Sequence, residues 1–180
     1  MKWVIRIGAT LIGLLLVGAV VLLAMGQRSR AGYMHSSIEI QAAPDRIWPW
    51  LEDPARLKQW LSWLVEVRGN DPAGVGAQRV WVMRDPNNGD AAMEIHNVYT
   101  EYTRPTRMAI RSGTPGEFDG TASYHLTDLG NGRTRLDAEG QFHYQIWFAQ
   151  LMEPLITPQA EKKERMDLAH LKELVEKSAQ

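Results

Sequence analysis

The sequence contains no cysteine, so disulfide bonds and thiolate metal sites are both excluded. Its five histidines include neither the H-E-x-x-H spacing nor a close pair on one helix face. No serine stands in a G-x-S-x-G nucleophile elbow, and no glycine-rich stretch matches a phosphate-binding loop. The motifs therefore predict no metal site, no cofactor and no catalytic residue.

Charge is missing from residues 7–25, a run of 19 residues with basic side chains on both sides. The flanking basic residues are Lys2, Arg6, Arg28 and Arg30. At about 1.5 Å per residue, such a run is close to the length needed to cross a bilayer core of about 30 Å. Trp3 stands where an interfacial aromatic residue would. We therefore predict a transmembrane anchor over residues 1–26, which contacts the membrane through residues 3–25.

A cleaved signal peptide is the alternative, because Ala24 and Gly26 offer small residues at the cleavage positions. The apolar run is, however, longer than the roughly 7–15 residues of a signal-peptide core. The positive-inside rule leans towards a cytoplasmic N-terminus. We expect a single-pass protein of a bacterial inner membrane with its domain in the periplasm. A linker over residues 27–34 would hold that domain close to the bilayer.

The part of the chain after residue 30 is mildly acidic, with 16 basic against 21 acidic side chains. Proteins that bind phosphate backbones present a basic face. This balance does not favour nucleic-acid binding, and we predict no nucleic-acid partner.

Residues 38–67, IEIQAAPDRIWPWLEDPARLKQWLSWLVEV, change pattern three times. The alternating isoleucines at the start predict a strand. Ala43-Pro44 then opens a helix, since proline at the first helical position loses no hydrogen bond. Asp53-Pro54 opens a second short helix with a good N-cap. The β-branched run at the end predicts the next strand.

Further strands follow, separated by turn residues, and give seven in all. They are the first strand and residues 63–68, 78–84, 92–102, 107–112, 118–127 and 134–144. The stretch 86–89, Pro-Asn-Asn-Gly, predicts a hairpin tip because Asn-Gly tolerates the positive φ of a tight turn. Residues 128–132 predict a second hairpin loop. Short connections imply antiparallel pairing.

The chain from Ile146 onwards has a helical pattern, which we expect to be interrupted at Pro154 and Pro158. Thr157-Pro158 predicts a fresh helix start. Beyond it, apolar residues recur at helical spacing: Met166, Leu168, Ala169, Leu171, Leu174 and Val175. A sheet that curls around this helix would bury the apolar faces of both.

The opening stretch resembles the START-like superfamily, also called SRPBCC, which includes polyketide cyclases and lipid-transfer domains. GTASYHLTDLGNGRTRLDAEG is similar to its penultimate hairpin, and ERMDLAHLKELVEK is similar to its closing helix. The resemblance covers residues 36–177. It implies an α+β helix-grip fold over residues 35–180. In this fold a seven-stranded curved antiparallel sheet wraps around a long C-terminal helix, with two short helices after strand one. It also implies a hydrophobic ligand held between sheet and helix.

Alternation along the strands predicts which side chains line the concave face of the sheet. They are Trp81, Met93, Tyr99, Met108, Ile110, Tyr124, Phe142 and Tyr144. Each of them could simply belong to the core. Methionine and tyrosine beside small residues such as Ala122, Ala138 and Gly140 nevertheless suit an adaptable apolar cavity with a few polar tips. We predict that this cavity binds a lipid or another hydrophobic small molecule.

Three functions remain open. The sequence favours a membrane-anchored binding or carrier module without catalysis. A cyclase- or dehydratase-type enzyme would need polar groups that converge in the cavity, and the candidates are Tyr99, Tyr124, Tyr144 and His96. The third function is that of a non-enzymatic partner of another membrane protein. A cavity filled by Trp48, Trp60, Trp81 and Trp147 would indicate it. The sequence identifies no protein partner.

Overall fold

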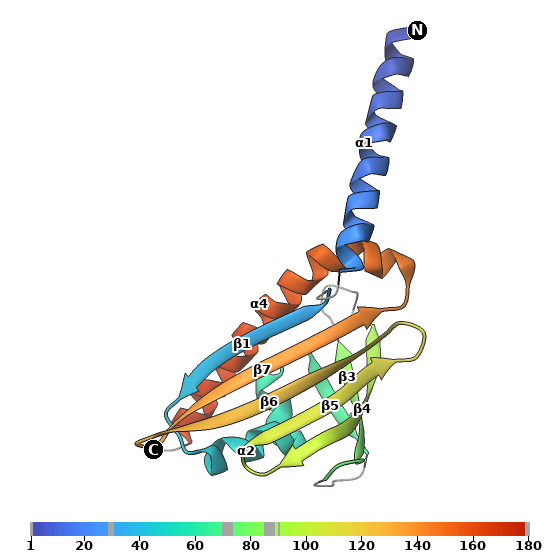
Figure 1. Ribbon diagram of the computed structural model, residues 1–180. Coiled ribbons are helices and arrows are strands. Elements are labelled where there is room, and N and C mark those ends of the chain that lie inside the picture. The colour runs from blue at the N-terminus through green and yellow to red at the C-terminus, as the bar shows by residue number, and fades with distance from the viewer. Residues whose placement is uncertain (1, 29–30, 70–73, 85–88, 90, 179–180) are drawn as a thin grey trace.

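The computed structural model describes residues 2–28, 31–69, 74–84, 89 and 91–178 (Figure 1). The helices are α1 (Lys2–Gly26), α2 (Pro44–Glu52), α3 (Pro54–Trp60) and α4 (Trp147–Lys177). The strands are β1 (Tyr33–Ile40), β2 (Leu64–Arg68), β3 (Gln78–Arg84), β4 (Ala92–Thr103), β5 (Arg107–Thr114), β6 (Phe118–Gly130) and β7 (Arg133–Tyr144).

The strands form one antiparallel sheet in the order β1-β7-β6-β5-β4-β3-β2. The first strand is thus an edge strand that pairs with the last one, with Ile38 opposite Leu136. Helix α4 packs along β1 and β7, and α2 and α3 lie between the sheet and the far end of α4 (Figure 1). This is the predicted α+β helix-grip fold, with two short helices after the first strand.

The two short helices begin where their sequence signals predicted. Pro44 opens α2, and Asp53 caps α3 by accepting a hydrogen bond from the backbone N–H of Ala55 (2.8 Å). Their apolar faces carry the largest buried side chains of the core, among them Trp48 and Trp60. These helices therefore fill the space between the sheet and the C-terminal half of α4.

The β6–β7 hairpin is tighter than the predicted loop of residues 128–132. Gly130 pairs with Arg133, so the connection is the two residues Asn131 and Gly132, with φ values of 54° and 69°. Two consecutive positive φ values are typical of a type I′ turn, which matches the twist of the flanking strands. Of the other predicted tip, residues 86–89, only Gly89 is among the described residues, and its φ of 61° is positive as predicted.

The expected break in α4 is wrong, because the helix runs through both prolines. Pro154 has no N–H to donate to the carbonyl group of Gln150, four residues earlier. That carbonyl group instead lies against Gly26, the last residue of α1. Thr157 does not start a new helix, since its hydroxyl group donates to the Glu153 carboxylate (2.8 Å). In Figure 1, α4 changes direction near the base of α1, as expected of a proline kink.

The apolar stripe of α4 is narrower than predicted. Leu168, Leu171 and Val175 are buried against the core. Their spacing of three and four residues places them on one face. Met166 and Ala169 lie on the other face and are exposed among charged residues.

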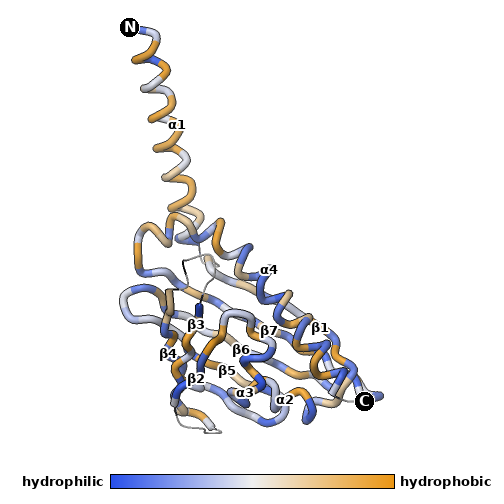
Figure 2. The backbone as a smooth tube through the Cα atoms, turned by 180° about the vertical axis from the view of Figure 1, so that it is seen from behind, coloured by the Kyte–Doolittle hydropathy of each residue, from blue (hydrophilic) through white to orange (hydrophobic). Residues whose placement is uncertain are grey.

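Helix α1 stands away from the domain and has no buried residue (Figures 1 and 2). It is long and apolar enough to cross a membrane, a length and composition that signal sequences can share. The chain enters the domain soon after it: Ala31 is already buried, and β1 begins at Tyr33. The domain boundary at residue 35 and the linker over residues 27–34 stay predictions.

Candidate functional site

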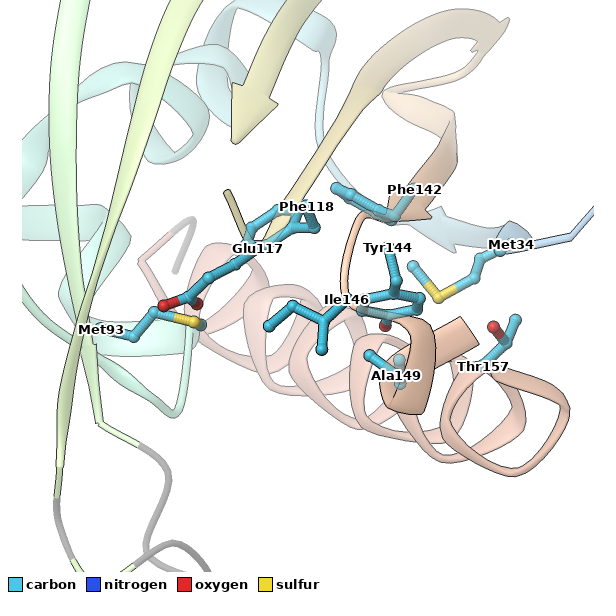
Figure 3. Close-up of a pocket in the computed structure, with 11 residues that line it drawn as sticks. Met34, Met93, Glu117, Phe118, Phe142, Tyr144, Ile146, Ala149 and Thr157 are labelled. Carbon is cyan, nitrogen blue, oxygen red and sulfur yellow. The ribbon is translucent and has the colours of Figure 1, made fainter. Parts of the chain in front are cut away.

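A cavity of about 350 Å³ lies at the end of the sheet from which α1 leaves. We call it the end cavity (Figure 3). Its lining residues from the sheet and its turns are Gly32, Met34, Met93, Glu117, Phe118, Phe142 and Tyr144. Its lining residues from the start of α4 are Ile146, Ala149, Thr157 and Ala160. Its volume falls at the small end of the range of ligand pockets, about 300–1,000 Å³.

Phe142 forms a wall of the end cavity because two neighbouring residues have no side chain. A Cβ atom on Gly120 would lie 2.5 Å from Cδ1 of the Phe142 ring, and one on Gly140 would lie 3.0 Å from Cε2. The two glycines thus leave room for the ring on this part of the sheet. Phe118 meets it edge-on, with 6.0 Å between the ring centroids.

A few polar groups interrupt the apolar lining. Burial raises the pKa of Tyr144, and the nearby Glu153 carboxylate raises it further, so the phenol stays neutral and can donate a hydrogen bond. Glu117 is exposed in the turn before β6, and Figure 3 shows it extending towards Met93. An apolar space with a few polar groups suits a hydrophobic ligand with a polar end.

Glu153 connects the start of the domain to α4. Its side chain is buried, and its Oε1 accepts hydrogen bonds from the backbone N–H of Gly32 (2.7 Å) and from the hydroxyl of Thr157 (2.8 Å). Arg28 lies 3.7 Å from the same oxygen. Oε2 is buried without a hydrogen-bond partner in the described part of the chain. Glu153 also lines a second cavity of about 230 Å³, between the end of α1 and β7.

The structure divides the eight predicted site residues into two groups. Met93, Phe142 and Tyr144 line the end cavity. The other five belong to the core or pack against it: Trp81, Tyr99, Met108, Ile110 and Tyr124. Binding of a ligand by any of the eight stays a prediction. Alternation along a strand identifies the face of a side chain, but not whether a helix packs against it at that point.

The interior under α2 and α3 is closely filled. Trp48 and Trp60 are buried there, and the indole N–H of Trp60 donates to the carbonyl of Trp50 (2.8 Å). The hydroxyl group of Tyr99 lies 3.2 Å from Nη1 of the buried Arg79. Ala138, which we expected to leave room for a ligand, is 1% exposed within this core.

The polar candidates for an enzyme do not converge. Tyr144 lines the end cavity, Tyr99 and Tyr124 lie in or against the core, and His96 is exposed. Burial strongly raises the pKa of Tyr124, and the carboxylates of α4 add to this effect. Among the residues that the structure describes, no group of three or more histidine, aspartate or glutamate side chains is placed to hold a metal ion.

Sequence reasoning missed several lining residues, among them Met34, Phe118, Ile146 and Ala149. Each lies near the end of an element rather than in its middle. In an antiparallel sheet of this order, the start of β1 and the end of β7 meet at one edge. The strand order, together with the position of the α4 start, was the signal that could have brought them together.

Solved structures with the same fold come from several bacteria. A protein from Nitrosomonas europaea has a TM-score of 0.66 and 18% sequence identity, over 84% of this chain and 99% of its own. A conserved protein from Geobacillus kaustophilus has a TM-score of 0.67 and 15% identity, over 81% and 96%. A protein from Thermus thermophilus has a TM-score of 0.65 and 16% identity, over 82% and 99%. At these identities the likeness shows the fold alone.

No curated protein matches the sequence. A family match begins at Tyr33, the first residue of β1, so α1 precedes the matched region. The match covers residues 33–176, and the chain belongs to the family described as polyketide cyclase / dehydrase and lipid transport.

Proposed function

We propose that this protein is a membrane-anchored module that binds or carries a lipid or another hydrophobic small molecule in its end cavity. The observation that carries the proposal is the cavity itself, an apolar space of about 350 Å³ at the end of the domain to which the proposed membrane helix α1 connects. Its small volume favours a single acyl chain or a compact ring system over a whole two-chain lipid. The family's description, which includes lipid transport, supports the same class of ligand.

Anchoring by α1 is supported by its contacts with the folded domain. The backbone of Gly26 packs against the backbone of Gln150, and Arg28 lies beside the buried Glu153. Cleavage after Gly26 would remove the first of these contacts. With the N-terminus in the cytoplasm, towards which the positive-inside rule leans, the domain would lie on the periplasmic side of a bacterial inner membrane.

Photolabelling of the full chain in lipid vesicles tests the function. The probe is a long-chain fatty acid that carries a diazirine on its acyl chain. We expect mass spectrometry to recover label on peptides that contain Met34, Phe142 and Tyr144, and also along α1. Ala149→Trp places an indole in the end cavity, so it should abolish the cavity label and leave the α1 label unchanged.

Ligand binding in the end cavity and anchoring by α1 can fail independently. Label on α1 without label in the end cavity would refute ligand binding while leaving the anchor intact. A mature chain that lacks α1 would refute the anchor. Ala169→Trp, on the exposed face of α4, is the matched control and should keep both labels.

The filled core favours a second candidate, a non-enzymatic partner of another membrane protein. Trp48 and Trp60 are buried between the sheet and α4, where the superfamily resemblance implied a ligand. Trp81 packs against the same core, whereas Trp147, which was also expected there, is exposed. Absence of label from the end cavity of the unmodified chain would favour this function.

A further inference from the structure

Helix α4 changes character at Ala160. From Trp147 to Ala160 it has one ionisable residue, Glu153, and that side chain is buried. In this described stretch, therefore, the outer surface carries no charged side chain. From Glu161 to Lys177, ten of 17 residues are charged. One continuous helix thus combines an uncharged first part with a charged second part.

The outer side of the first part is strongly apolar. Trp147 is 68% exposed and Phe148 is 56% exposed. Leu155, which lies seven residues after Phe148, is 54% exposed. The rings of Trp147 and Phe148 contact each other edge-on, with centroids 5.9 Å apart. Scattered exposed apolar residues are ordinary, whereas a contiguous group of large ones marks an interaction surface. We call these three residues, with Ile146, the aromatic edge.

The inner side of the same stretch forms part of the end cavity. Ala149, Thr157 and Ala160 line it. Ile146 belongs to both sides, because it is exposed and also lines the cavity. A thin layer, one helix wide, thus separates the end cavity from the surface that the aromatic edge covers.

The position of this stretch identifies what covers it. Gly26 directly follows the apolar run of residues 7–25, and its backbone contacts the backbone of Gln150 of α4. A helix of 25 residues is about 37 Å long, more than the roughly 30 Å of a bilayer core, so its end lies in the interface. Figure 1 shows the first turns of α4 running across the base of α1. If α1 spans the bilayer as proposed, the aromatic edge would therefore lie at the height of the lipid headgroups.

We propose that the aromatic edge inserts into the membrane interface and that the hydrophobic ligand passes between the bilayer and the end cavity beside it. This proposal rests on the proposed anchor and cavity. Tryptophan and other aromatic side chains favour this layer, and a stretch without exposed charge meets no penalty there. A soluble protein partner would instead surround the aromatic edge with protein at the same height at which lipid headgroups surround the end of α1.

The absence of cysteine makes the depth measurement direct. Single variants Leu15→Cys, Phe148→Cys and Met166→Cys of the full chain receive a fluorescent label in phosphatidylcholine–phosphatidylglycerol vesicles. Met166 is the matched control, since it is apolar, exposed and on the same helix, about 27 Å further along. Quenching by spin-labelled lipids should be strong at 15, clear at 148 for headgroup-proximal spin labels, and absent at 166.

The three positions distinguish failure of this inference from failure of the anchor. A label at 15 that is quenched while the label at 148 is not would overturn the interfacial position and leave the anchor standing. A label at 15 that is not quenched would overturn the anchor, and this inference with it.

The route is tested by the rate at which the diazirine fatty acid, added to vesicles, labels the end cavity. The double variant Trp147→Gln, Phe148→Gln should slow this labelling, with labelling of α1 unchanged. Trp147→Phe with Phe148→Trp keeps both aromatic rings and should retain the original rate. Equal rates in the glutamine variant and the unmodified chain would refute the route, even where the cavity itself is labelled.

Discussion

Glu164 lies on α4 opposite β1, where its Oε2 accepts a hydrogen bond from the Ser36 hydroxyl (2.8 Å). Burial raises the pKa of this carboxyl group, although the hydrogen bond from Ser36 lowers it in part. The folded state therefore holds the proton more tightly than the unfolded state does. Stability that comes from the protonated form is present below the unfolded pKa and is lost as pH rises through the folded pKa. At neutral pH the charged group is a net cost.

Glu164→Gln should for this reason increase stability at pH 7, by up to about 1 kcal/mol for a partly exposed group. Glutamine keeps the size of the side chain and an acceptor for Ser36. The gain should shrink as pH falls from the raised folded pKa towards the unfolded value of about 4.3, and it should be gone below that value, where the original carboxyl group is protonated in both states. Chemical unfolding of the full chain in detergent at several pH values measures it.

Glu173→Gln removes the same charge from an exposed position of α4 and is the control. Its effect should stay within about 0.5 kcal/mol. A loss of stability in Glu164→Gln at pH 7 would show that the carboxylate is favourable where it lies.

At the scale of elements, the contact between α1 and α4 depends on a glycine without a side chain and on a proline without a backbone N–H. Gly26 has no side chain, and Pro154 has no N–H to occupy the carbonyl of Gln150. A Cβ atom on Gly26 would overlap that carbonyl oxygen and lie 3.2 Å from its carbon. The two helices approach closely because Gly26 has no side chain and because Pro154 cannot donate an N–H to the Gln150 carbonyl.

Gly26→Ala should therefore weaken this contact and lower stability by about 1–3 kcal/mol, the range for an overpacked site. It should also speed cleavage by trypsin at Arg28 and Arg30, between α1 and the domain. Gly18→Ala is the matched control, since nothing lies within 4 Å of that position and alanine favours a helix. Equal behaviour of the two variants would contradict the contact.

The sequence predicted the elements better than their contacts. The starts of α2 and α3 followed from Pro44 and the Asp53 cap, which are local signals. The break at Pro154 was wrong because the helix continues through the proline, with the freed carbonyl of Gln150 against Gly26 of a neighbouring helix, and no local pattern contains that neighbour. The site was predicted in part, since alternation cannot tell Tyr144 at the open end from Tyr99 in the packed core.

For the molecule as a whole, the interior between sheet and helix has two unlike regions. Under α2 and α3, side chains fill it around Trp48 and Trp60. At the α1 end it opens into the end cavity. Ala138 belongs to the first region, opposite Tyr124 and Ser36 in its neighbouring strands, and Ala149 belongs to the second. The same substitution at these two alanines therefore compares a full space with an empty one.

Ala138→Trp should destabilise the protein by about 1–3 kcal/mol or more, because a filled core can admit the indole only through strain. Ala149→Trp should cost less than about 1 kcal/mol, since the indole enters existing space and buries apolar surface there. Chemical unfolding of both full-length variants in the same detergent makes the comparison. Equal losses would mean that the end cavity cannot admit a side chain of this size. A small loss at Ala149 alone would show that removal of the photolabel by this variant reports an occupied site, because the fold around it would still be intact.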